Sequence, residues 1–163
     1  MPNTLFIRPN RVHHVVDATF EWALYDIAGE QIKYGARTTL DMIDQTLMQN
    51  GVENVDLVAL WPSFAAFSTK ISLPGNQTRF VQQALPFAVE DQVAQDIEQI
   101  HIALGAKSKG GDFPVVCSDK SLFSAFFDSL TDESAVGPLK AIHLDAELLP
   151  RSDQRAVLCI SSD

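Results

Sequence analysis

The segment from residue 72 to residue 105 constrains the fold of this chain more than any other part of it. It reads SLPGNQTRFVQQALPFAVEDQVAQDIEQIHIALG, in which a Pro-Gly turn precedes a long run of regularly spaced apolar residues. Asn76 is a favourable N-cap for a helix that begins at Gln77. Because Pro86 has no amide hydrogen to donate to the carbonyl of Gln82, and its ring crowds that turn, the pattern predicts two helices or a sharp kink at this proline.

The second half of this segment is acidic, and no Lys or Arg occurs between Phe80 and Ala106. At ~100° per residue, a helix would gather its apolar residues on one face, and these are Val89, Val93, Ile97 and Ile100. The polar sides of that helix carry the candidate partner-binding residues, which are Glu90, Asp91, Gln95 and Glu98. This pattern is typical either of a solvated surface helix or of a docking face for a basic partner, and both interpretations stay open.

The rest of the chain alternates between patterns of strands and helices. Strands are expected at residues 4–8, 20–27, 31–38, 55–61, 64–73, 100–104, 114–117, 139–144 and 155–160. Helices are expected at residues 40–49, after Thr39 as N-cap, and 120–130, after Asp119 as N-cap. This order predicts an α/β sheet with helices on its faces.

Composition limits the classes of partner. A chain of 163 residues with 46% hydrophobic and 20% charged residues is typical of one substantial globular domain, or of one domain with a small insertion. The formal net charge of −9 argues against nucleic acid and anionic lipid as partners, because both attract clustered Lys and Arg. Basic or apolar protein partners remain compatible with this charge.

No segment has the length of a membrane span. The best candidate, residues 57–67, is much shorter than the ~18 apolar residues required and is broken by Pro62. The N-terminus has only three apolar residues before Arg8, too few for the core of a signal peptide. We therefore expect no direct membrane insertion by this chain, which would stay on the side of the membrane where it is made.

No constellation of residues predicts catalysis, a cofactor or a metal. The chain has no HExxH, paired CxxC or G-x-S-x-G motif, and the loop from Gly105 to Gly110 lacks the Lys and Ser or Thr that a phosphate loop requires next. His101 lies inside a predicted strand, where a structural role is favoured. Cys117 and Cys159 lie in apolar runs, which is typical of buried thiols in a reducing compartment.

Several stretches together resemble one family. They are LFIR (residues 5–8), SLPG (72–75), QALPFAVEDQ (83–92), IALG (102–105) and LDAELLP (144–150). With these motifs in this order, the chain closely resembles the cytoplasmic region of type II secretion system protein L (GspL). The resemblance covers nearly the whole chain, and QALPFAVEDQ is its most specific part.

The resemblance implies a fold and a domain organisation. The family's cytoplasmic region has an actin-like, RNase H-related α/β fold, with a mixed sheet and helices. The similar layout of the pilus-assembly protein PilM implies a first lobe at residues 1–61 and 110–150, with a small inserted α+β subdomain at residues 62–109. Residues 151–163 would then begin a truncated second lobe.

The resemblance also implies a non-enzymatic role. The family forms a scaffold at the cytoplasmic face of the bacterial inner membrane, which recruits the N-terminal region of the secretion ATPase (GspE) and links it to the membrane protein GspM. Contacts with GspM and self-association would use segments largely outside this chain, which lacks the family's membrane helix.

The alternative is an actin-like nucleotide-binding ATPase or kinase-type enzyme. Such enzymes usually open with a D-x-G-[ST]-type phosphate hairpin. Here residues 8–19 contain no glycine, and the second hairpin offers only Asp26-Ile-Ala-Gly29. We therefore expect no nucleotide cofactor and no enzyme activity.

Overall fold

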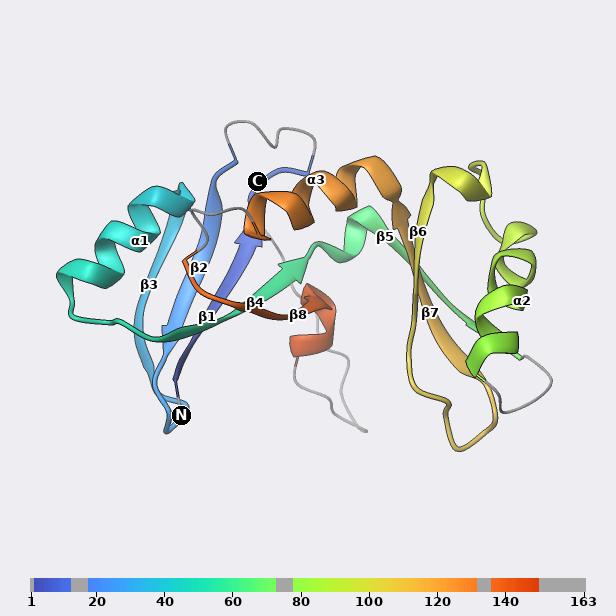
Figure 1. Cartoon of the computed structure of the whole chain (residues 1–163), viewed down its shortest axis with the longest axis horizontal. Coiled ribbons are helices and arrows are strands. Elements are labelled where there is room, and N and C mark those ends of the chain that lie inside the picture. Colours follow the sequence, from blue (N-terminus) through green and yellow to red (C-terminus); the bar gives the residue numbers. More distant parts are fainter. Residues whose placement is uncertain (1, 13–17, 73–77, 132–135, 150–163) are drawn as a thin grey trace. The chain divides into compact units, whose positions relative to one another are not determined.

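The computed structural model describes residues 2–12, 18–72, 78–131 and 136–149. It contains two compact units, shown in Figure 1. Unit 1 combines Met1–Ser63 with Ser129–Asp163, and unit 2 is Phe64–Asp128.

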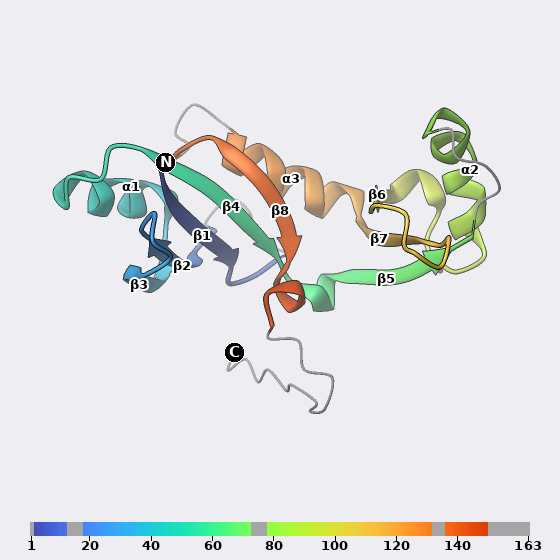
Figure 2. The same cartoon turned by 90° about the horizontal axis from the view of Figure 1, so that it is seen from below.

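Unit 1 is built on a five-stranded mixed sheet in the order β3-β2-β1-β4-β8 (Figures 1 and 2). β1 (Asn3–Pro9), β2 (Phe20–Tyr25) and β3 (Gln31–Thr38) form an antiparallel meander, as the predicted hairpin requires. β4 (Val55–Trp61) runs parallel to β1, and β8 (Leu139–Leu144) runs parallel to β4. The carboxyl ends of β1, β4 and β8 therefore lie at one edge of the sheet.

The core of unit 1 follows from alternating side chains. Along β4 every second residue is fully buried and the residues between are half-buried, so the strand is less enclosed than its continuous apolar run predicts. α1 (Leu40–Gln49) connects β3 to β4 and buries Ile43 and Leu47. Thr39 is the N-cap residue, as predicted, although its side chain makes no capping hydrogen bond, and Met48 near the end of α1 is exposed.

Unit 2 is a three-stranded antiparallel sheet with a helix packed on one face. The strands follow the order β5-β7-β6, with β5 at Ala66–Ile71, β6 at Ile100–Leu104 and β7 at Phe113–Asp119. α2 (Thr78–Glu90) covers the face that carries Ile71, Ile100, Phe113, Val115 and Cys117. Val81, Leu85 and Val89 of α2 complete this core.

α2 continues through Pro86, so of the two predicted alternatives, two helices or a sharp kink, that of two helices is wrong. A proline inside a helix costs about 3 kcal/mol, because one hydrogen bond is lost and the ring crowds the preceding turn. Leu85 and Val89, on either side of Pro86, are both buried in the core of unit 2, and their burial offsets that cost. The predicted cap Asn76 and the predicted first helical residue Gln77 lie outside the described residues.

α3 (Lys120–Thr131) begins where the sequence predicts. The Oδ1 atom of Asp119 accepts a hydrogen bond from the backbone N–H of Leu122 at 2.9 Å, which confirms Asp119 as its N-cap. α3 begins in unit 2 and ends in unit 1. Unit 1 resumes at Ser129 and not at residue 110, because β7 pairs with β5 and β6 in the sheet of unit 2.

The remaining elements are three single helical turns, η1 (Ser63–Ala65), η2 (Ile97–Gln99) and η3 (Asp145–Leu148). In the part of the chain that the structure describes, no helix combines the length and apolar character needed to cross a membrane. The strand predicted at residues 155–160 and the second lobe predicted from residue 151 lie outside the described residues.

Candidate functional site

The four predicted partner-binding residues are all exposed, but they do not share a helical face. Glu90 is the last residue of α2, Asp91 and Gln95 lie in the turns that follow, and Glu98 lies in η2. The prediction of one acidic helix through Glu98 is therefore wrong. The chain leaves the helix after Glu90 because it must reach β6, whose pairing with β7 begins at Ile100.

The apolar side of this connection is correctly predicted despite the different backbone. Val89 and Ile100 are buried in the core of unit 2, and Val93 and Ile97 pack against it. With these four side chains turned to the core, the polar residues between them are left in water. We call residues 90–98 the acidic connection. Its polar residues are exposed, and Val93 and Ile97 anchor it to the core of unit 2.

Two side chains outside the four candidate partner-binding residues fix the acidic connection. The Oε1 atom of Gln92 accepts a hydrogen bond from Thr69 Oγ1 of β5 at 2.6 Å, and its Nε2 atom donates to the carbonyl of Ala88 at 3.2 Å. Asp96 caps η2 by accepting a hydrogen bond from the backbone N–H of Glu98 at 3.1 Å. Polar residues next to a helix end are the sequence signal that could have found them.

The charge of the acidic connection is largely uncompensated. Among the described residues, the carboxylates of Glu90, Asp91 and Glu98 form no ion pair. One cation approaches from outside the segment, since Nζ of Lys120 donates to the backbone carbonyl of Glu98 at 3.4 Å. Among the described residues, Glu90 and Asp91 have no such contact with a cation.

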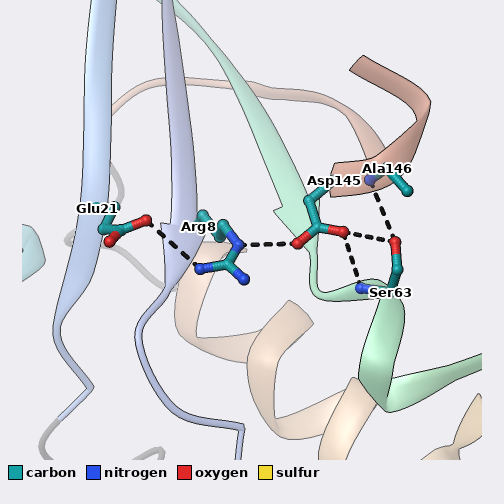
Figure 3. Close-up of polar contacts among 5 residues, drawn as sticks. All are labelled: Arg8, Glu21, Ser63, Asp145 and Ala146. Atoms are coloured by element: carbon teal, nitrogen blue, oxygen red, sulfur yellow. Dashed lines mark hydrogen bonds and ion pairs between the residues drawn. The ribbon is translucent and has the colours of Figure 1, made fainter. Parts of the chain in front are cut away.

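A second polar cluster lies in unit 1, where β1, β4 and β8 end (Figure 3). The Oδ1 atom of Asp145 accepts hydrogen bonds from the backbone N–H of Ser63 at 2.9 Å and from its Oγ at 2.5 Å. The Oδ2 atom of Asp145 accepts a hydrogen bond from Nε of Arg8 at 2.9 Å. Arg8 also contacts Glu21 of β2 at 3.4 Å, and Ser63 Oγ accepts a hydrogen bond from the backbone N–H of Ala146 at 3.2 Å.

This strand-end cluster occupies the edge at which open α/β sheets bind ligands. Burial alone would raise the pKa of Asp145, but the hydrogen bonds from Ser63 and Arg8, together with the charge of Arg8, lower it overall. Asp145 therefore stays ionised, and both of its oxygens already accept hydrogen bonds. Such a carboxylate is suited to joining strand ends and not to taking a proton from a substrate.

Two titratable side chains of unit 2, His101 and Cys117, are packed against other residues and have shifted pKa values. The ring of His101 stacks on Phe123 with centroids 4.0 Å apart, and burial, with a smaller effect of the Lys120 charge, lowers its pKa. Cys117 is a buried free thiol whose pKa is raised by burial. Within the described residues, no group of three or more His, Cys, Asp or Glu side chains is arranged to hold a metal ion.

Comparisons with known proteins identify the family. The family model described as type II secretion system (T2SS), protein L, matches residues 5–162. The protein L of Pseudomonas aeruginosa is 35% identical over 89 residues, which cover 55% of this chain and 23% of that protein. The protein L of Dickeya chrysanthemi is 29% identical over 135 residues, which cover 83% of this chain and 33% of that protein. The chain thus spans a third or less of the curated relatives it matches.

Solved structures show the same fold. The cytoplasmic domain of EpsL, an inner-membrane component of the type II secretion system of Vibrio cholerae, matches with a TM-score of 0.70 and 21% identity, over 93% of this chain and 60% of that domain. The PilM–PilN complex of type IV pilus biogenesis matches with a TM-score of 0.58 and 11% identity, over 88% of this chain and 47% of that one. The predicted fold class, an α/β fold with a mixed sheet and helices, is confirmed, and it is the fold of the EpsL cytoplasmic domain. Because the family model matches almost the whole chain, the chain belongs to the type II secretion system protein L family.

Proposed function

We propose that this chain is a cytoplasmic scaffold of the inner-membrane platform of the type II secretion system, and that it recruits the N-terminal region of the secretion ATPase GspE. The observation that carries this proposal is the family match over residues 5–162. The link to the membrane complex through GspM is part of the same proposal and would use segments beyond this chain. The chain would then work at the cytoplasmic face of the bacterial inner membrane.

The charge of unit 2 supports docking as the mechanism. The carboxylates of Glu90, Asp91 and Glu98 lie in water without an ion pair among the described residues, so a basic partner loses no existing contact when it binds them. Gln95, exposed on the same connection, adds hydrogen-bonding capacity without charge. We propose these four residues as part of the ATPase interface.

Direct binding tests this proposal. The chain is immobilised and titrated with the purified N-terminal region of GspE at low and high salt, because screening weakens contacts between exposed charges. The Asp91→Lys/Glu98→Lys double variant should bind more weakly than the wild type. The control is the Glu30→Lys/Glu53→Lys double variant, which changes net charge equally at exposed positions of unit 1. No binding by the wild type contradicts recruitment, whereas equal binding by both variants removes the acidic connection from the interface.

The enzyme alternative is tested separately by thermal shift with Mg-ATP. A ligand at ~100 times its dissociation constant adds about 2.7 kcal/mol to the free energy of unfolding, which is readily seen as a raised Tm. We expect no shift in Tm, because Arg8, Ser63 and Asp145 of the strand-end cluster already form hydrogen bonds with one another and would have to break them to bind a nucleotide. A clear rise in Tm would favour the nucleotide-binding alternative.

A further inference from the structure

α2 has a second apolar side that faces away from the core of unit 2. Phe80 and Phe87 are separated by two helical turns, about 10.5 Å along the axis, and at ~100° per residue they lie within about 20° of each other around it. The side chains of Val81, Leu85 and Val89 occupy the opposite side and are buried. Phe80 is 61% exposed and Phe87 is 75% exposed. We call these two residues the Phe80–Phe87 stripe.

Two phenylalanines on one outward face differ from the scattered exposed apolar residues that every protein has. Each ring left in water forgoes most of the favourable free energy that burial would give it. The helix does not need them for its own stability, because its inner side is already filled. Apolar side chains aligned on one exposed face are typical of a surface that another protein covers.

Charge at one end of the stripe indicates the chemistry of that protein. Glu90 ends α2, Asp91 follows it directly, and both are exposed without an ion pair among the described residues. The carboxyl end of a helix already carries partial negative charge, so these carboxylates strengthen the attraction for cations at this point. A complementary surface needs apolar residues opposite the rings and Lys or Arg opposite Glu90 and Asp91.

We infer that the Phe80–Phe87 stripe, together with Glu90 and Asp91, binds an amphipathic helix of another protein, which carries apolar residues two turns apart and Lys or Arg at one end. A helix fits because its own side chains repeat with the same spacing as the two rings. This inference rests on the proposed scaffold role and adds to it the contacting face and the kind of segment bound. It does not require that the bound helix belong to the ATPase.

The charge also disfavours two other occupants. A second copy of this chain would bring the same net charge of −9, and its α2 carries one Arg, Arg79, against the two carboxylates of Glu90 and Asp91. An anionic membrane surface would be repelled by Glu90 and Asp91. Both occupants give distinct results in the test below.

Site-specific photo-crosslinking in the intact protein, in its host cells, tests the inference. The photoreactive residue p-benzoylphenylalanine is installed in place of Phe80 or Phe87, both exposed, and in separate cells in place of Tyr34, an exposed aromatic residue of unit 1. After irradiation the crosslinked peptide is identified by mass spectrometry. We expect positions 80 and 87 to capture one short segment of another protein, with apolar residues in helical spacing and a Lys or Arg excess, and position 34 not to capture it.

Charge reversal supplies the second measurement. Glu90→Lys with Asp91→Lys should reduce the yield of that adduct at least about tenfold, whereas the net-charge control Glu30→Lys/Glu53→Lys should leave it unchanged. Capture of the same chain, of lipid or of an acidic segment overturns the inference. So does the absence of any adduct at positions 80 and 87, or an adduct whose yield the Glu90 and Asp91 reversal leaves unchanged.

The outcome is separable from that of the proposed function. In one outcome, GspE binds the wild type and the Phe80→Ser/Phe87→Ser variant equally well, and no adduct forms at positions 80 and 87. The proposed scaffold role then stands, and the inference about the Phe80–Phe87 stripe is wrong. If the captured basic helix belongs to a protein other than GspE and GspE does not bind, the stripe stands and ATPase recruitment is wrong.

Discussion

The guanidinium of Arg8 donates a hydrogen bond from Nε to Oδ2 of Asp145 at 2.9 Å, although the two residues are 137 positions apart in the chain. Arg8 lies near the end of β1, and Asp145 directly follows β8. Between these strands runs β4, whose end is held by the contacts of Ser63 with the same carboxylate. One side chain thus fastens the carboxyl ends of all three parallel strands of unit 1.

Removal of this carboxylate should destabilise the protein. Asp145→Ala leaves Arg8 and the backbone N–H of Ser63 without their acceptor in a partly buried site, so we expect a loss of about 2 kcal/mol in the free energy of unfolding. Urea denaturation measures it. Glu147→Ala is the control, because Glu147 pairs with His143 through half-exposed side chains, and such pairs contribute less than about 1 kcal/mol. Equal losses in the two variants would contradict the role of Asp145.

Acid should weaken the protein partly through the same residue. The pKa of Asp145 is lowered in the folded state from its ordinary value of 3.8, so the unfolded chain takes up this proton first as the pH falls. The stabilisation is fully present above about pH 5 and is lost as the pH falls through 3.8 toward the lowered pKa. Urea midpoints measured between pH 6 and pH 3 should fall more steeply for the wild type than for Asp145→Asn. Parallel curves would remove Asp145 from the acid response.

His101 should make stability depend on pH in a higher range. Burial, followed by the Lys120 charge, lowers its pKa from 6.5, so between 6.5 and the lowered value the unfolded chain binds a proton that the folded chain does not. Stability should therefore decrease as the pH falls below 6.5. Thermal unfolding at pH 8 and pH 5.5 should show a larger difference in Tm for the wild type than for His101→Gln. The opposite order would contradict the lowered pKa.

Gly35 of β3 should be required for the packing of Trp22. A Cβ atom at residue 35 would lie 2.5 Å from Nε1 and 2.9 Å from Cε2 of the Trp22 ring, which is buried. Because the ring has little room to move, Gly35→Ala should cost about 1–3 kcal/mol of unfolding free energy and change the tryptophan fluorescence. The control is Gly110→Ala, since a Cβ atom there would meet only Ser108 Oγ at 3.7 Å. A Gly35→Ala variant as stable as the control would contradict this account.

The sequence predicted those elements whose signals are local. The hairpin of β2 and β3 follows from two strand patterns separated by a short turn, and α3 follows from its Asp119 cap. The prediction failed where tertiary contacts override the local pattern. Pro86 predicts two helices or a sharp kink, yet one helix continues across it, and the burial of Leu85 and Val89 stabilises that helix.

The candidate site was predicted in composition but not in geometry. The core contacts of four apolar residues are correctly predicted, and these are Val89, Val93, Ile97 and Ile100. The reason given for them, helical spacing, is wrong, because the helix ends at Glu90. The contact of Arg8 with Asp145 has no local signal, since it depends on which strands become neighbours in the sheet. The exposure of Phe80 and Phe87 was likewise hidden, because only the fold decides which side of α2 meets the core.

Cys117 should be unreactive in the folded protein. Its side chain is buried in the core of unit 2, and burial raises its pKa above the ordinary value, so little thiolate is present near pH 8. In a Cys159→Ser background, which leaves Cys117 as the single cysteine of the sequence, the thiol should react with Ellman's reagent at least about a hundredfold more slowly than in 6 M guanidinium chloride. If the rates in folded and unfolded protein are similar, unit 2 opens readily and the core that supports α2 is less stable than its packing indicates.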